Sequence, residues 1–243
     1  MSTSISFKRV RAIFVKDYKE FSRNYGLSIM LTLPIILALL IRGVDSSLPL
    51  ASVAGTFATV LNLSFVLLTC FAQACLIAEE KERSTLRSLM MTPATSLDVL
   101  IGKSSLVFVM SAVILTVSTY IFEYTPVNIW AFATAVILSI ILYIAVGTIC
   151  GLFSRTLLDA SLSIIPVAFV FSGAPWGVLL ADDFPIFQVL EYTPSVQLVR
   201  LLSIESTGFT TGDLLKPLLI ILAWTVVLSI VSVVMYQRRS TDE

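Results

Sequence analysis

The sequence contains no histidine and few charged residues, and both shortages narrow what the chain can do. Without histidine it lacks the commonest metal ligand and the side chain that most often serves as a general base near neutral pH. Charged residues make up only 13% of the 243 residues, whereas soluble domains carry about 25%. A soluble surface depends on polar groups, and so few charges do not supply them. We therefore expect a membrane protein.

Cysteine and net charge are scarce as well. The three cysteines, Cys70, Cys75 and Cys150, lie within apolar runs and show neither a disulfide framework nor a paired metal-ligand spacing. We interpret them as small packing residues. The formal net charge is zero, which gives no electrostatic argument for binding nucleic acid.

Apolar residues, in contrast, make up 57% of the chain. A helix needs about 20 of them to cross the hydrocarbon core of a bilayer, and six stretches without Asp, Glu, Lys or Arg are long enough. The expected fold is an all-α integral membrane protein, with one transmembrane domain over residues 1–243. Its six transmembrane helices are predicted near residues 26–42, 50–78, 103–122, 129–153, 160–181 and 215–236.

The basic residues give these spans an orientation. Six spans place both termini on one side of the membrane, and most Lys and Arg residues then fall on that side. Only Arg42, Arg200 and Lys216 fall on the other side. Because basic residues concentrate in cytoplasmic segments, the sequence predicts a multi-pass plasma-membrane protein, prokaryotic in type, with cytoplasmic N- and C-termini.

Residues 5–23 combine apolar positions three or four residues apart with basic residues on much of the other face. This pattern predicts an interfacial amphipathic helix on the inner leaflet. A solvated basic segment leading into the first span is the alternative. The residues that define the helix are Phe7, Val10, Phe14, Tyr18, Phe21 and Arg23.

The charged segment after the second span is the most informative part of the sequence. Residues 79–83 read Glu-Glu-Lys-Glu-Arg. Burying them in the membrane would cost on the order of 12 kcal/mol, so the second span is expected to end before them. Ser84 or Thr85 can cap a short amphipathic helix that stops at Pro93. Such a helix suits docking of a soluble partner, and a solvated loop that only sets topology explains the charges equally well.

Small residues and prolines mark the later spans. Gly147 and Gly151 have the GxxxG spacing that lets two helices approach closely, within the chain or at a dimer seam. Residues 183–204 hold apolar stretches too short to cross a membrane, and half-helices that dip into the outer leaflet fit them. Candidate outer-gate residues in this region are Gly173, Pro175, Trp176, Pro185, Pro194 and Arg200.

Catalytic chemistry is not visible in the sequence. Gly102-Lys103-Ser104 matches the end of a phosphate-binding loop, but Leu97 stands where the motif needs its first glycine. The six uncharged runs offer no Asp, Glu, Lys, Arg or His for an intramembrane enzyme, a proton-coupled carrier or an acidic channel ring. The chain is therefore not expected to be an enzyme, and another polypeptide must handle ATP.

In their order, these features resemble the permease subunits of ABC-2-type exporters. The local match consists of Glu80, Glu82, Arg83, Thr85, Leu86, Leu89, Pro93, Gly102 and Lys103, with Ser84 at a position where the family carries glycine. Lys16 to Tyr25 and Pro34 look like the family's connecting helix and first span. Ser172-Gly173, Pro185, Thr193-Pro194 and Arg200 resemble its outer half-helices.

The resemblance implies a complex of two permeases, as copies or paralogues, with two ABC ATPase subunits in membrane lipid. It places a coupling segment at residues 80–97, in which the ATPase-docking residues would be Glu80, Glu82, Arg83, Thr85, Leu86, Arg87, Leu89, Met90 and Pro93. The chain itself would bind no cofactor, with ATP and Mg held by the partner ATPase.

The same resemblance implies that the first, second and fifth spans line the translocation path. The uncharged spans favour an amphipathic peptide, a lipid-like molecule or a drug-like molecule as substrate. A non-transporting membrane scaffold or immunity protein is the alternative function. A channel-like pore is a third.

Overall fold

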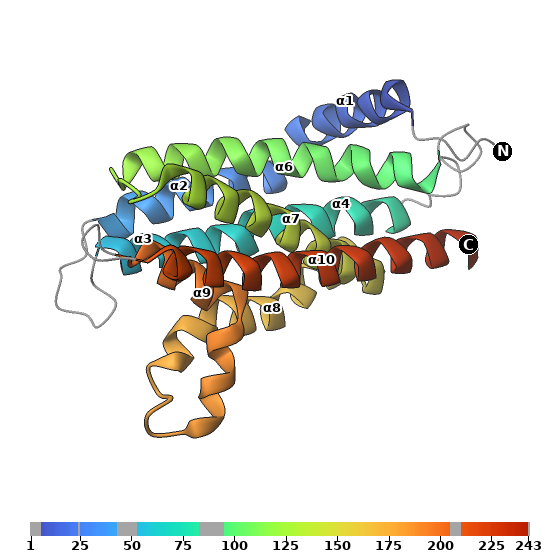
Figure 1. The fold of residues 1–243 in the computed structure, drawn as a ribbon. Coiled ribbons are helices and arrows are strands. Elements are labelled where there is room, and N and C mark those ends of the chain that lie inside the picture. The colour runs from blue at the N-terminus through green and yellow to red at the C-terminus, as the bar shows by residue number, and fades with distance from the viewer. Residues whose placement is uncertain (1–5, 24, 43–52, 83–94, 205–209, 243) are drawn as a thin grey trace.

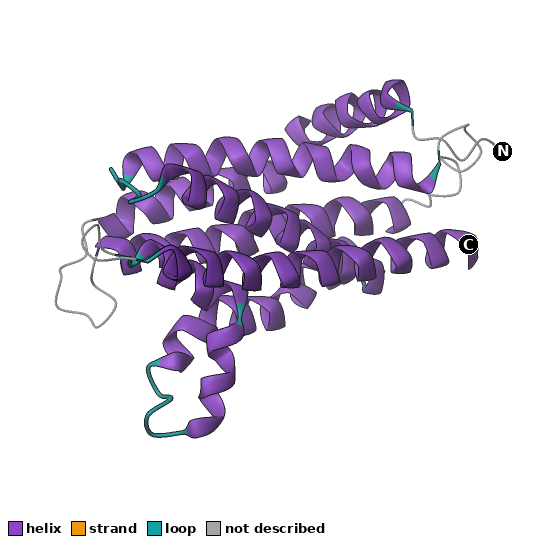
Figure 2. Cartoon of the chain, viewed as in Figure 1, coloured by secondary structure: helices purple, strands orange, loops and turns teal. Residues whose placement is uncertain are grey.

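The computed structural model describes residues 6–23, 25–42, 53–82, 95–204 and 210–242, drawn in colour in Figure 1. Within these segments the chain is helical, with short loops and turns and no strand (Figure 2). The expected all-α class is therefore confirmed for the described part of the chain.

Among the described residues, five helical segments are long and apolar enough to cross a membrane. The helix α2 (Tyr25–Arg42) covers the first predicted span, and its apolar part, Leu31–Ile41, is shorter. The five long segments are the rod formed by α3 (Val53–Ser64), η1 (Phe65–Cys70) and α4 (Phe71–Glu82), followed by α6 (Ser96–Ile121), α7 (Ile129–Phe153), α8 (Leu157–Val178) and α10 (Thr211–Asp242).

The long helices run side by side as a bundle (Figure 1). The helix α1 (Phe7–Arg23) begins and α10 ends at the same end of this bundle, which we call the terminal end. The last turns of α8 and the 3₁₀-helix η2 (Pro185–Tyr192) project from the bundle as a hairpin. The chain then returns to the bundle through α9 (Pro194–Leu202).

The second predicted span is continuous and longer than expected. Its helix passes through the six-residue π-helical segment η1 and continues past Ala78 to Glu82. The expectation that the helix stops before the charged run is therefore wrong. The charges at residues 80–82 are compatible with a helix because groups on other helices pair with each of them, as described below.

Two glycines on α7 allow it to lie against η1 and α4. A Cβ atom on Gly147 would come within 2.4 Å of the Cys70 carbonyl oxygen, and one on Gly151 within 2.7 Å of the Ala74 carbonyl oxygen. Real Cβ atoms do not approach backbone oxygens so closely, so only glycine fits at either position. Of the two uses considered for this GxxxG spacing, packing within the chain is confirmed.

A buried polar residue also ties three spans together. Gln73 on α4 donates from Nε2 to the Thr148 hydroxyl of α7 at 3.0 Å and to the Ser104 hydroxyl of α6 at 3.3 Å. Interhelical hydrogen bonds of this kind contribute to helix association in membranes, where apolar side chains gain little by leaving lipid. They fix the register of α4 against α6 and α7.

The glycine contacts predict the effect of a side chain at these positions. Gly151→Val should destabilise the bundle by about 1–3 kcal/mol, because the added methyl groups overlap the backbone of α4. Gly173→Val is the matched control, since a Cβ there meets no atom within 4 Å. Thermal unfolding in detergent should show a midpoint several degrees lower for Gly151→Val only. Equal midpoints for the two variants would contradict the close contact.

Candidate functional site

Seven charged residues gather at the terminal end of the bundle, and we call them the charged junction. They come from helices far apart in sequence and surround the two ends of the segment 83–94. The junction consists of Arg9 and Asp17 on α1, Glu80, Lys81 and Glu82 on α4, and Asp98 and Lys103 on α6.

Lys103 occupies the centre of the junction and is only 2% exposed. Its Nζ lies 3.2 Å from Glu80 Oε1 and 3.3 Å from Asp17 Oδ2, and it donates to the Leu76 carbonyl oxygen at 3.2 Å. One ammonium group therefore joins α1, α4 and α6. Asp17 and Glu80 are buried too, so each of the three groups depends on the others to offset the cost of removing its charge from water.

Lys81 and Glu82 bind the connection between α7 and α8. Lys81 Nζ donates to the carbonyl oxygens of Leu152, at 2.7 Å, and of Ser154. These carbonyls lie at the C-terminal end of α7, where a helix has unpaired acceptors and a partial negative charge. Glu82 Oε2 accepts from the backbone N–H of Leu157, at 2.9 Å, in the first turn of α8. Lys81 thus caps the end of α7, and the next residue, Glu82, caps the start of α8.

Asp98 fixes the start of α6 in a similar way. Its carboxylate accepts from the Thr95 backbone N–H at 2.9 Å, while the Thr95 hydroxyl accepts from the Asp98 N–H at 3.2 Å, forming a capping box. The same carboxylate accepts from the Ser6 N–H at 2.9 Å and lies 2.9 Å from Arg9 Nε. The first turn of α6 is therefore attached to α1.

Gly102 lets α1 lie directly on α6. A Cβ atom there would come within 2.8 Å of Ile13 Cγ2 and 3.3 Å of the Val10 carbonyl oxygen. Gly102 and Lys103 thus act together, since the glycine brings α1 close enough for Asp17 to reach the lysine. In the sequence this pair stands out only as part of the local family match and of an incomplete phosphate-binding motif, and the structure gives it this physical role.

Only some of the docking residues predicted from sequence lie within the described chain. Arg83, Thr85, Leu86, Arg87, Leu89, Met90 and Pro93 lie outside the described residues. Glu80 and Glu82 are described, and both carboxylates bind groups of this same chain. Contact of these residues with an ATPase stays a prediction, while Glu80 and Glu82 bind other helices of this chain just before residue 83.

The predicted N-terminal helix exists, but its bundle-facing side differs from the expected apolar face. Phe21 is buried and Phe14 packs against the core, whereas Phe7 is 81% and Tyr18 54% exposed. Of the remaining two residues of the predicted set, Val10 is half-buried and Arg23 is exposed. Ile13, Asp17 and Phe21, spaced four apart, face the bundle. Sequence reasoning missed Asp17, because a charged residue reads as part of the polar face.

The predicted outer-gate residues lie along the projecting hairpin and its return. Gly173, Pro175 and Trp176 belong to the last turns of α8, Pro185 begins η2 and Pro194 begins α9. Arg200 on α9 pairs with Glu191 at 2.9 Å. Gly177 marks the contact of η2 with α8, because a Cβ there would come within 2.5 Å of Leu190 Cδ1. Whether these residues form a gate stays a prediction.

A comparison with protein families bears on this arrangement of spans and junction. Residues 41–234, more than half of the chain, match the model described as ABC-2 family transporter protein. The chain belongs to the ABC-2 family of transporter proteins. This permease is thus a multi-pass transmembrane subunit of an ABC transporter, and its family implies an ATPase partner. No curated protein matches the chain. The matched region includes Glu80, Asp98 and Lys103 but begins after α1, which supplies Asp17 and Arg9.

The lysine at the centre of the junction predicts a strong effect of its removal. Lys103→Met leaves the buried carboxylates of Asp17 and Glu80 facing each other without the ammonium group that joins them, which should cost about 3–5 kcal/mol. We expect a markedly lower thermal midpoint in detergent. Lys16→Met is the control, since Lys16 is well exposed and lies 3.8 Å from Asp17.

A variant that lacks all three charges separates the effect of charge pairing on stability from the effect of packing. Replacing Asp17 by Asn and Glu80 by Gln in the Lys103→Met background removes all three charges together. Most of the lost stability should return, because no unpaired buried charge remains. A triple variant as unstable as Lys103→Met alone would show that the lysine acts by something other than its pairing.

Proposed function

We propose that this permease works in an ATP-driven exporter and that the charged junction carries movement of the ATPase into the membrane spans. In this proposal the complex contains two permeases, identical or paralogous, and two ABC ATPases that hold ATP and Mg. The six predicted spans cross the plasma membrane, with the terminal end in the cytoplasm. They are α2, the α3–α4 rod, α6, α7, α8 and α10.

One observation supports this most strongly: the residues that flank segment 83–94 on both sides bind other helices. Immediately before it, Glu80, Lys81 and Glu82 bind α6, the end of α7 and the start of α8. Immediately after it, Thr95 and Asp98 cap α6 and bind α1. A force applied by an ATPase to the segment would therefore reach five helices through short, directional contacts.

The proposed transport step is a change in the populations of two arrangements of the spans. ATP binding closes the ATPases, which moves the docked segments and, through the junction, α4 and α6. Because Lys81 and Glu82 bind the connection between α7 and α8, those helices move with α4. The nucleotide drives the change only to the extent that it binds one arrangement more tightly.

The translocation path is proposed to run along α2, the α3–α4 rod and α8, against the same helices of a second permease. The helix α8 supports this because it exposes an uncharged stripe at helical spacing, formed by Leu158, Leu162, Ile165 and Phe169. Such a stripe suits contact with lipid, a second permease or an amphipathic substrate. An amphipathic peptide or a lipid-like or drug-like molecule is the proposed cargo.

The charged junction predicts a variant that still binds the ATPase but transports poorly. In the permease co-expressed with its ATPase, Lys81→Met with Glu82→Gln should still co-purify the ATPase, because segment 83–94 is intact. ATP-dependent transport in proteoliposomes should fall by about tenfold, which corresponds to a lost coupling free energy of about 1.4 kcal/mol. Lys216→Met, at the other end of the bundle, should leave both quantities unchanged.

A change within segment 83–94, the proposed docking segment, should have the opposite effect and prevent ATPase binding. Leu86→Asp places a charge on the proposed apolar docking face and should prevent co-purification of the ATPase, while membrane insertion stays normal. Full ATPase binding and transport in Leu86→Asp would overturn the docking assignment. Loss of ATPase binding in the Lys81 and Glu82 variant would instead show that these residues touch the ATPase directly.

A further inference from the structure

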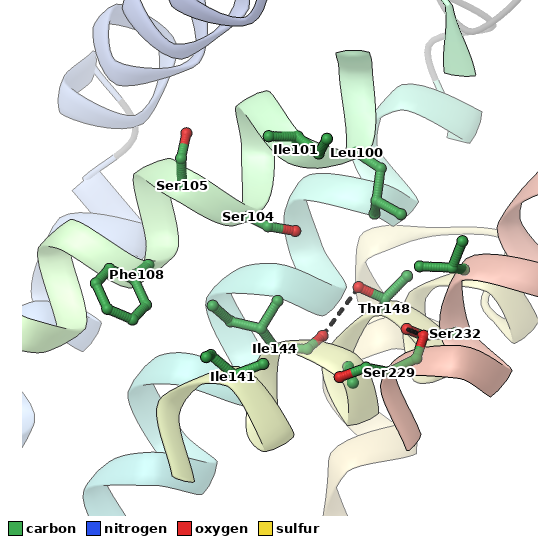
Figure 3. Close-up of a pocket in the computed structure, with 12 residues that line it drawn as sticks. Leu100, Ile101, Ser104, Ser105, Phe108, Ile141, Ile144, Thr148, Ser229 and Ser232 are labelled. Atoms are coloured by element: carbon green, nitrogen blue, oxygen red, sulfur yellow. Dashed lines mark hydrogen bonds between the residues drawn. The ribbon is translucent and has the colours of Figure 1, made fainter. Parts of the chain in front are cut away.

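A cavity of about 340 Å³ lies between α6, α7 and α10 (Figure 3). Its volume is in the range of small-molecule sites, about 300–1,000 Å³. It involves neither α8 nor the α3–α4 rod, so it is separate from the path proposed above. It also differs in chemistry from the charged junction, because no residue that lines it is charged.

The walls of the cavity are apolar and one side is open. Phe108 and Leu100 line it from α6, Ile144 from α7 and Val233 from α10. Ile101 and Ile141, also in its lining, are 38% and 37% exposed. All three helices are long and apolar enough to cross a membrane, from which we infer that the opening faces hydrocarbon rather than water.

Four hydroxyl groups from the three helices meet in this apolar space: Ser104, Thr148, Ser229 and Ser232. Thr148 donates to the Ile144 carbonyl oxygen at 2.9 Å and Ser232 to that of Ser229 at 2.9 Å. Ser104 accepts from Gln73. Within the described chain, the hydroxyl hydrogens of Ser104 and Ser229 have no protein acceptor, and both residues line the cavity.

The depth of these hydroxyls distinguishes between possible occupants. Ser104 is eight residues beyond Ser96, and Ser229 is ten before Arg239, so they lie roughly 12 and 15 Å inside the ends of the apolar segments Ser96–Ile121 and Thr211–Arg239. That depth falls within one leaflet of a hydrocarbon core about 30 Å thick. A phospholipid has only hydrocarbon there and offers the two serines no acceptor. A short molecule that carries its polar group into the membrane does offer them an acceptor.

We propose that this cavity is a binding site for a small uncharged amphiphile. Its hydrocarbon body would pack against the apolar walls, and one hydroxyl or carbonyl oxygen would accept hydrogen bonds from Ser104 and Ser229. A charged molecule is excluded because the lining offers no counter-charge and the surrounding medium is apolar. This inference does not rest on the proposed transport function.

Photolabelling of the purified permease with octanol that carries a diazirine on its chain tests the site. Illumination should label residues of the cavity wall, identified by mass spectrometry, and excess octanol should compete. Ser104→Ala with Ser229→Ala should lower labelling at limiting probe by about three- to tenfold, as expected for the loss of one or two hydrogen bonds. Ser229→Phe should abolish it by filling the space.

Ser105→Ala is the matched control, because Ser105 also lines the cavity from the same turn of α6, but its hydroxyl points away from it and donates to the Gly102 carbonyl oxygen (Figure 3). Its labelling should equal that of the unmodified chain. Unchanged gel-filtration profiles confirm that the variants fold. If Ser229→Phe does not fold, the two alanine substitutions decide the result.

Two further probes distinguish the sources of hydrocarbon. A diazirine-bearing octane, which lacks the hydroxyl, should label the wall several-fold less than the octanol. A phospholipid with a diazirine in its acyl chain should label lipid-facing residues without preference for the cavity. Equal labelling of the cavity by the phospholipid, or octanol labelling that is indifferent to the Ser104 and Ser229 changes, would overturn the proposal.

Discussion

The ion pairs of Lys103 are the interaction on which the terminal end of this permease depends. A lysine that is almost fully buried must find carboxylates, and here they come from α1 and from the last turn of α4. Once Asp17 and Glu80 are held there, α1 must lie on α6, which is possible because residue 102 is glycine. The chain segments on both sides of residues 83–94 are fixed as a result. A neutral residue at position 103 would remove the reason for each of these placements.

The charged run at the end of α4 shows how a bundle can keep charges at a membrane boundary without ending a helix. On insertion scales each charge counts as a cost, but those scales describe a helix alone in lipid. Here Glu80 faces a lysine, Lys81 faces the carbonyl end of α7, and Glu82 faces the amide end of α8. Each group supplies what a neighbouring helix lacks. The helix can therefore extend to residue 82, and its last turn becomes the place where three other helices are joined to it.

Much of this fold follows from the sequence because bilayer thickness fixes helix length. Long uncharged stretches predicted α6, α7, α8 and α10 and the continuous rod, and residues 5–23 predicted α1. The partners of Lys103 could not be predicted in the same way, because its pairing with Asp17 spans 86 positions and is set by how helices pack. The face that α1 turns to the bundle could not be predicted for the same reason. Periodicity grouped its aromatic residues, whereas the bundle selected Asp17 for its charge and left Phe7 exposed. The π-helical segment likewise has no visible sequence signal.

The position of α6 links the two sites of this molecule. Lys103 and Ser104 are neighbours in sequence, so their side chains leave the helix about 100° apart. One faces α1 and α4 in the charged junction, and the other faces α7 and α10 across the cavity. Gln73 of α4 bonds to Ser104 and to Thr148, so it stands between the two regions. A rotation of α6 that draws Lys103 from its carboxylates therefore also changes the distance between Ser104 and the hydroxyls opposite. The width of an uncharged site within the membrane is in this way mechanically connected to the ion pairs at its end.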